Sequence, residues 1–75
     1  MLGETVQRLR YEKGWGVLQL SKRSGVPEHV IEEIESGRPY VPSEANTVLL
    51  AEAFGVSVGL MLVERERLME ELWRR

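Results

Sequence analysis

Residues 17–37 read VLQLSKRSGVPEHVIEEIESG, and the order of apolar, glycine and proline positions in this stretch decides the fold. Leu20 is the inward position of a first short helix. Gly25 ends that helix, because glycine adopts a positive φ without a Cβ clash. Pro27 suits the first turn of a second helix, where its missing N–H has no partner to lose. The stretch therefore predicts two short helices joined by a tight turn.

The second of these helices has one apolar face. Val30, Ile31 and Ile34 follow the i, i+1, i+4 spacing of a buried helical stripe, and Gly37 stands where a C-terminal cap is expected. The same projection turns four polar side chains outward: Glu28, His29, Glu32 and Glu33. Two helices in this order form a helix-turn-helix pattern.

Over most of residues 4–62 the chain resembles the Cro/phage-repressor superfamily, also called the XRE family. The resemblance rests on the order and spacing of LRYEKGW (9–15), LSKRSGV (20–26), IEEIESGR (31–38), PS (42–43) and LAEAFGVSV (50–58). It implies an all-α, five-helix, lambda-repressor-like domain whose second helix of the pair lies in the DNA major groove.

A first helix precedes the pair. Leu2, Val6 and Leu9 recur at i, i+4 and i+7, which predicts an amphipathic helix over residues 3–13. Trp15 follows in an apolar position, and we interpret it as sealing the core between the first two helices, because aromatic side chains mostly serve packing.

Two further helices follow the pair. Ser43 caps a fourth helix that ends at Gly55, and Ser57 caps a fifth. Nothing breaks the fifth helix between Leu60 and Arg75, so it should run well past the short last helix of a minimal family member.

Composition favours one small domain. The 75 residues are 43% hydrophobic and 29% charged, as in globular proteins. We expect a single helix-turn-helix domain over residues 1–75, with a family-like core at 1–62 and a helix extension at 63–75. No apolar run is long enough to cross a membrane and no signal pattern begins the chain, so we expect a cytoplasmic protein without membrane contact.

No catalytic constellation is visible. The chain has no Cys, no Asp, one His and no glycine-rich phosphate loop. We therefore expect no enzymatic activity, no cofactor and no bound metal.

The resemblance also assigns functional residues. Arg10 and Glu35 stand where the family has a buried ion pair, which would orient the helices. The base-facing positions are Val17, Glu28, His29, Glu32 and Glu33, and the DNA-backbone positions are Lys13, Lys22, Arg23, Arg38 and Tyr40.

Two of these positions have more than one interpretation. Many family members place Gln at position 17 to touch a phosphate, which Val17 cannot do. Val17 either touches a thymine methyl or forms with Leu18 an apolar surface for a protein partner. His29 is a base contact, a proton switch or a plain surface residue.

The acidity of the outward face leaves two functions open. Net charge is −2, and a carboxylate about 6 Å from a phosphate is repelled by ~0.7 kcal/mol in water or ~3 kcal/mol at an effective dielectric constant of about 20. The first hypothesis is a DNA-binding transcriptional regulator that reads duplex DNA through residues 28–35. The alternative is a degenerate helix-turn-helix that binds a protein through this acidic face.

The last helix has two alternative roles. A 4-3-4-3 spacing favours a seam that joins two chains into a homodimer, formed by Val58, Leu62, Arg65, Met69 and Leu72. Alternatively, Met61, Leu68 and Trp73 fold this helix onto its own domain.

Overall fold

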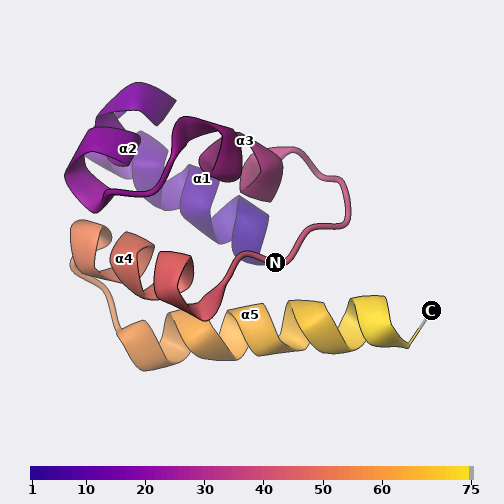
Figure 1. Cartoon of the computed structure of the whole chain (residues 1–75). Helices are drawn as coiled ribbons and strands as arrows, with labels where there is room; N and C mark the ends of the chain where they lie inside the picture. The colour runs from indigo at the N-terminus through magenta and orange to yellow at the C-terminus, as the bar shows by residue number, and fades with distance from the viewer. Residues whose placement is uncertain (75) are drawn as a thin grey trace.

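The computed structural model describes residues 1–74, and over them the chain forms five α-helices and no strand. These are α1 (Leu2–Lys13), α2 (Val17–Ser24), α3 (Glu28–Glu35), α4 (Glu44–Phe54) and α5 (Val58–Trp73). The predicted all-α fold is confirmed. In Figure 1, α1, α2 and α3 form the upper part of the molecule, α4 lies below them, and α5 runs along the lower edge. None of the described helices is long and apolar enough to span a membrane.

All five helices contribute to one core. Its fully buried side chains include Leu2 and Val6 of α1, Leu20 of α2, Ile31 of α3, Leu50 of α4 and Met61 of α5. α2 and α3 have pronounced apolar stripes, so the hydrophobic effect fixes which face of these two helices turns inward. Thr47 is buried as well, and its hydroxyl donates to the Ser43 carbonyl at 2.9 Å, so this polar group is not left without a partner.

The first turn of α1 packs very closely against the end of α3. A Cβ atom added at Gly3 would collide with the carbonyl oxygen of Ile34. Glycine is therefore required at this position for the two backbones to approach each other. The sequence pattern did not reveal this contact, because Gly3 looks like an ordinary residue of a helical first turn.

The helix starts differ in the quality of their caps. Ser43 Oγ accepts from the Asn46 N–H at 3.0 Å, and Ser57 Oγ accepts from the Leu60 N–H at 3.2 Å, so both predicted caps are confirmed. Gly16 begins α2 without a side-chain acceptor, and its own N–H donates to Gln19 Oε1 over a long 3.4 Å. The start of α2 is thus more weakly capped than the starts of α4 and α5.

The inner side of α5 packs on its own domain. Met61 is buried, and Val58 and Leu68 pack against the core. Arg65 Nε donates to the Pro42 carbonyl at 2.7 Å, so Arg65 faces the start of α4. Because Val58 and Arg65 face inward, the five residues of the predicted seam do not form one outward face.

The second interpretation of α5, in which Met61, Leu68 and Trp73 fold it onto its own domain, holds only in part. Trp73 is 86% exposed and is not folded onto the domain, although Met61 and Leu68 are. The helix ends at Trp73, and Arg75, to which the sequence pattern extended it, lies outside the described residues.

Candidate nucleic-acid interface

The α2–turn–α3 unit has the bounds that the sequence predicted. Gly25 follows α2 with φ 83°, in the left-handed region that favours glycine. The buried Ser24 accepts from the Val26 N–H at 3.0 Å, and Val26 is itself completely buried. This hydrogen bond and the burial of Val26 hold the turn rigidly, so the direction of α3 relative to α2 is well defined.

The inward and outward faces of α3 are cleanly separated. Val30, Ile31 and Ile34 are buried, as predicted. Glu28, His29 and Glu32 are exposed, and the fourth outward residue, Glu33, is partly exposed. The predicted base-facing residues of α3 therefore share one accessible surface, which is mostly carboxylate.

Arg10 and Glu35 join the end of α1 to the end of α3. Arg10 Nε donates to Glu35 Oε2 at 2.9 Å and Nη2 donates to Oε1 at 2.6 Å, a bidentate pair. The two side chains are 9% and 8% exposed, so the predicted buried pair is present. Arg10 Nη1 also donates to the Trp15 carbonyl at 3.0 Å. The hydrogen bond to Glu35, as the largest cause, raises the pKa of Arg10 above its ordinary value, so the guanidinium stays charged.

Trp15 gathers basic side chains at the junction of α1 and α2. Its ring stacks on Phe54 of α4, with centroids 6.0 Å apart, which agrees with the predicted packing role. Arg23 lies over the same ring at 4.7 Å and Lys13 at 5.9 Å, both within cation–π range. The aromatic ring thus places two cations on one side of the molecule, next to α2.

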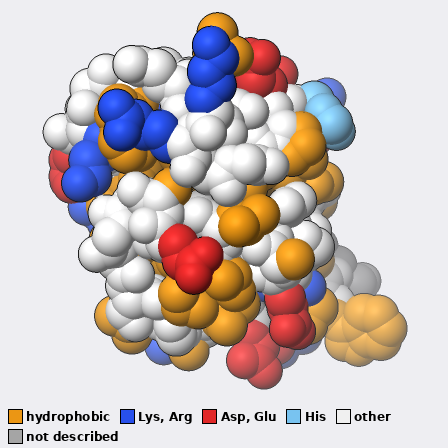
Figure 2. Space-filling model, turned by 60° about the vertical axis from the view of Figure 1, so that its left-hand side comes forward, with side chains coloured by type: hydrophobic (Ala, Val, Ile, Leu, Met, Phe, Trp, Pro, Cys, Tyr) orange, Lys and Arg blue, Asp and Glu red, His pale blue; other side chains and the backbone are white. Residues whose placement is uncertain are grey.

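This side of the molecule is basic. Lys13, Lys22 and Arg23 are all exposed, and none of them forms an ion pair with another residue of the described part of the chain. Figure 2 shows Lys and Arg side chains gathered in the upper part of the face that includes α2. Their ammonium and guanidinium groups are therefore available to an anionic ligand.

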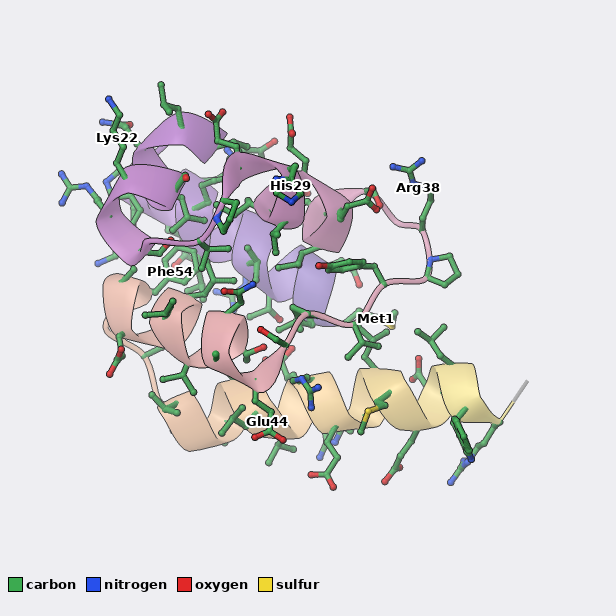
Figure 3. The ribbon with its side chains drawn as sticks, viewed as in Figure 1. Met1, Lys22, His29, Arg38, Glu44 and Phe54 are labelled. Atoms are coloured by element: carbon green, nitrogen blue, oxygen red, sulfur yellow. The ribbon has the colours of Figure 1, made fainter. Side chains whose placement is uncertain are left out.

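Arg38 and Tyr40 follow α3 in the connector to α4. Arg38 Nη2 donates to Glu33 Oε1 at 3.2 Å, and both side chains are exposed enough for solvent to compete. Tyr40 is half-buried and packs against the core. Its ring therefore contributes to the fold, in addition to the DNA-backbone contact predicted for it. Figure 3 shows Lys22, His29 and Arg38 spread along the upper side of the molecule.

The structure changes the interpretation of position 17. Val17 is partly buried and packs against the core, so it is not an outward base-facing residue. Leu18, one position further along α2, is 50% exposed and is the apolar side chain that the start of this helix presents to solvent. Val17 lies three residues before the buried Leu20, so the i, i+3 spacing places both on the inward side of α2, whereas Leu18 points about 100° away.

A family model described as a helix-turn-helix domain matches residues 1–68. The chain belongs to this helix-turn-helix family. The match covers the whole of α1 to α4 and ends within α5. Neither the curated proteins nor the solved structures contain a match to this chain. Membership of the helix-turn-helix family supports a DNA-binding regulator as the class of function.

Proposed function

We propose that this helix-turn-helix domain is a transcriptional regulator of the Cro/repressor type that reads duplex DNA through α3. The observation that supports the proposal is the placement of α3. Its apolar face is buried, the Arg10–Glu35 pair holds its end, and its outward face is accessible. A recognition helix needs this arrangement to enter the major groove without distortion of the fold.

Basic groups flank α3 where the DNA backbone would pass. Lys22 and Arg23 lie in the last turn of α2, and Arg38 follows the end of α3. In the view of Figure 3, His29 lies between Lys22 and Arg38. Cations on both sides of the helix can neutralise phosphates while the helix meets base edges.

The carboxylates of α3 limit this binding and give it selectivity. Glu28 and Glu32 are exposed without a partner in the described ion pairs, whereas Arg38 partly neutralises Glu33. A glutamate contacts a base favourably only by accepting from an amino group such as cytosine N4. We therefore propose weak non-specific binding and a preference for sites with cytosines opposite α3.

The first experiment measures phosphate contacts. A duplex obtained by selection from a random library is titrated at several salt concentrations, with wild type and the Lys22→Gln/Arg23→Gln variant. In a plot of the logarithm of the binding constant against the logarithm of the salt concentration, the slope should be smaller in magnitude by about 1.8 for the variant. Each lost phosphate contact contributes about 0.9 to that slope. Arg8→Gln/Arg74→Gln changes charge equally on α1 and at the end of α5, and it should leave the slope unchanged. Equal loss in both variants, or no duplex binding at any salt, contradicts the proposal.

The second experiment measures base selectivity. Glu28→Gln/Glu32→Gln/Glu33→Gln removes the repulsion, so affinity for a mixed-sequence duplex should rise by roughly threefold or more. The same variant should lose the wild-type preference for the selected duplex, because a Gln amide donates as well as accepts and so no longer selects for a base amino group. Selectivity that survives all three substitutions would show that these carboxylates do not read bases.

The acidic face also supports a second candidate function. Glu28, Glu32 and Glu33 lie on α3, and the exposed Leu18 lies at the start of α2. A carboxylate surface with an apolar neighbour fits a basic, amphipathic segment of a protein partner. Under this alternative, the wild-type chain binds a basic amphipathic peptide but no duplex at low salt, and the triple Gln variant loses the peptide.

A further inference from the structure

Two adjoining grooves lie along one side of α5, at the opposite edge of the molecule from α2 and α3 (Figure 1). The first has a volume of about 250 Å³ and is lined by Glu44, Leu62, Arg65, Glu66 and Met69. The second is lined by Met69, Glu70 and Trp73, so Met69 joins the two. In Figure 3, Glu44 lies at the start of α4, directly beside α5. We call the surface formed by these seven residues the α5 groove.

An apolar line runs along the α5 groove. Leu62, Met69 and Trp73 recur at i, i+7 and i+11, which is the spacing of one helical face. Leu62 is partly exposed, Met69 is 42% exposed and Trp73 is 86% exposed, so water meets much of this line. The helix-turn-helix family match ends at residue 68, so Met69 and Trp73 lie beyond it. Large exposed apolar side chains that share one face mark an interaction surface.

Carboxylates lie on both sides of this apolar line. Glu66 and Glu70 are about 40° and 80° around α5 from Leu62, in one direction. Both are exposed and have no ion-pair partner in the described part of the chain. Glu44 lies on the other side of the line, where it is 76% exposed and 3.9 Å from Arg65 Nη1. The apolar line is therefore flanked by negative charge along its length.

Arg65 neutralises little of this charge. Its Nε donates to the Pro42 carbonyl at 2.7 Å, and its side chain is only 17% exposed. Among residues 1–74, Arg65 is the only cation that lines the α5 groove. The groove thus combines an exposed apolar line with a net negative charge.

We propose that the α5 groove binds a basic amphipathic helix of a partner protein. The apolar face of that helix covers Leu62, Met69 and Trp73. The lysine and arginine side chains that border this face meet Glu44, Glu66 and Glu70. The unbranched thioether of Met69 adapts to the shape of its partner, and the ring of Trp73 adds a large apolar area.

The charge of the α5 groove selects this occupant over others. Two copies of one net-negative surface repel each other, so a second copy of the chain is disfavoured here. Nucleic acid and an anionic lipid surface are negative too, and the groove repels them for the same reason. A basic amphipathic helix supplies both the apolar face and the opposite charge. The inference does not rest on DNA binding, and its test contains no DNA.

The probe is a peptide of leucine and lysine, with the leucines on one face of a helix and the lysines on the rest of it. Calorimetry measures its dissociation constant for the full chain. Trp73 reports where the peptide binds, because its exposed ring should emit at shorter wavelength once leucine side chains cover it. Trp73→Phe keeps an aromatic ring in the groove, so this variant should still bind the peptide but lose the emission shift. A peptide of the same composition in scrambled order should bind much more weakly.

Charge reversal tests the carboxylates of the groove. Glu66→Lys/Glu70→Lys should raise the dissociation constant of the peptide by about tenfold or more, because attraction becomes repulsion at two positions. Glu52→Lys/Glu71→Lys makes the same change of net charge on α4 and on the opposite side of α5. This control should raise the dissociation constant by less than about threefold, because exposed charges far from the peptide are screened by salt. Circular dichroism should show native helix content for both variants.

The acidic face of α3 provides a second control. Glu28→Gln/Glu32→Gln/Glu33→Gln leaves the α5 groove intact, so it should bind the peptide as tightly as the wild type and with the same shift of Trp73 emission. Loss of the peptide in this variant, with binding retained in Glu66→Lys/Glu70→Lys, would place the peptide on α3 and overturn the inference.

Three other results also contradict the inference. The first is a wild type that does not bind the peptide, or that binds the scrambled peptide equally well. The second is an equal loss of affinity in Glu66→Lys/Glu70→Lys and Glu52→Lys/Glu71→Lys, which would mean that net charge alone attracts the peptide. The third is a wild type that sedimentation equilibrium shows to be dimeric and that the peptide does not dissociate, with Trp73 emission already at short wavelength. A second copy of the chain would then occupy the groove.

Discussion

Arg10 and Glu35 form a bidentate ion pair in which the nitrogen–oxygen distances are 2.9 and 2.6 Å, and this pair ties α3 to α1. Glu35→Ala would strand a guanidinium that is 9% exposed. We expect a loss of ~3–5 kcal/mol in the free energy of unfolding, because a buried charge without its partner is expensive. Chemical denaturation followed by circular dichroism measures this loss, which in so small a domain can amount to unfolding.

Glu32→Ala is the matched control for that measurement. It removes the same carboxylate from the same helix, but Glu32 is exposed and has no ion-pair partner in the described part of the chain. Its free energy of unfolding should change by no more than about 0.5 kcal/mol. Equal effects of the two substitutions would show that the Arg10–Glu35 pair does not contribute as its burial implies.

Gly3 and Gly59 predict opposite effects of the same substitution. Alanine is normally the better helix residue by up to about 1 kcal/mol. At Gly3 the added methyl meets the Ile34 carbonyl oxygen, whereas at Gly59 the nearest side-chain atom, Ser57 Oγ, is 3.8 Å away. Gly3→Ala should therefore destabilise the fold by ~1–3 kcal/mol, and Gly59→Ala should leave it unchanged or slightly more stable. Thermal denaturation of both variants checks the sign, and a more stable Gly3→Ala would contradict the close packing of α1 on α3.

Helix boundaries and caps were largely predictable from the sequence because their signals are local. Gly25 and Gly55 end helices in the left-handed conformation, and Ser43 and Ser57 cap helices through their own backbone neighbours. Such contacts depend on residues within one helical turn, which a sequence displays directly. The Arg10–Glu35 pair came from the family resemblance, since nothing local joins residues so far apart.

Features that depend on how helices approach each other were not predictable. Gly3 has its role only because α3 passes close to α1. Arg65 lies in a heptad-like pattern, yet it faces the Pro42 carbonyl because the connector before α4 passes beside α5. In each case the tertiary arrangement overrides the periodicity of a single helix.

The weak start of α2 predicts a stabilising substitution. Gly16 has φ −78° and ψ 173°, a conformation that suits a capping serine, and open space surrounds the position of an added Cβ. Gly16→Ser should raise the free energy of unfolding by a few tenths to about 1 kcal/mol, through a new cap and a less flexible unfolded chain. The reverse test is Ser57→Ala, which removes an existing cap and should cost about 1 kcal/mol. A loss of stability on Gly16→Ser would contradict the observed geometry at this helix start.

The last prediction concerns Arg38 and Glu33, which are joined at 3.2 Å beside the candidate DNA-binding surface. An exposed ion pair contributes at most about 1 kcal/mol, so a phosphate can displace Glu33 from Arg38. Glu33→Gln should increase affinity for a mixed-sequence duplex by roughly threefold or more, because it removes both the competitor and its repulsion. Arg38→Gln should lower the affinity and reduce the salt slope by about 0.9.

The double variant decides whether Glu33 acts through Arg38. If it does, Glu33→Gln should raise duplex affinity much less in the Arg38→Gln background than in the wild type, and the difference measures the coupling between the two side chains. Glu70→Gln makes the same change of charge on α5 and should leave affinity almost unchanged. Additive effects of Glu33→Gln and Arg38→Gln would instead mean that Glu33 repels the DNA directly and that the ion pair does not control Arg38.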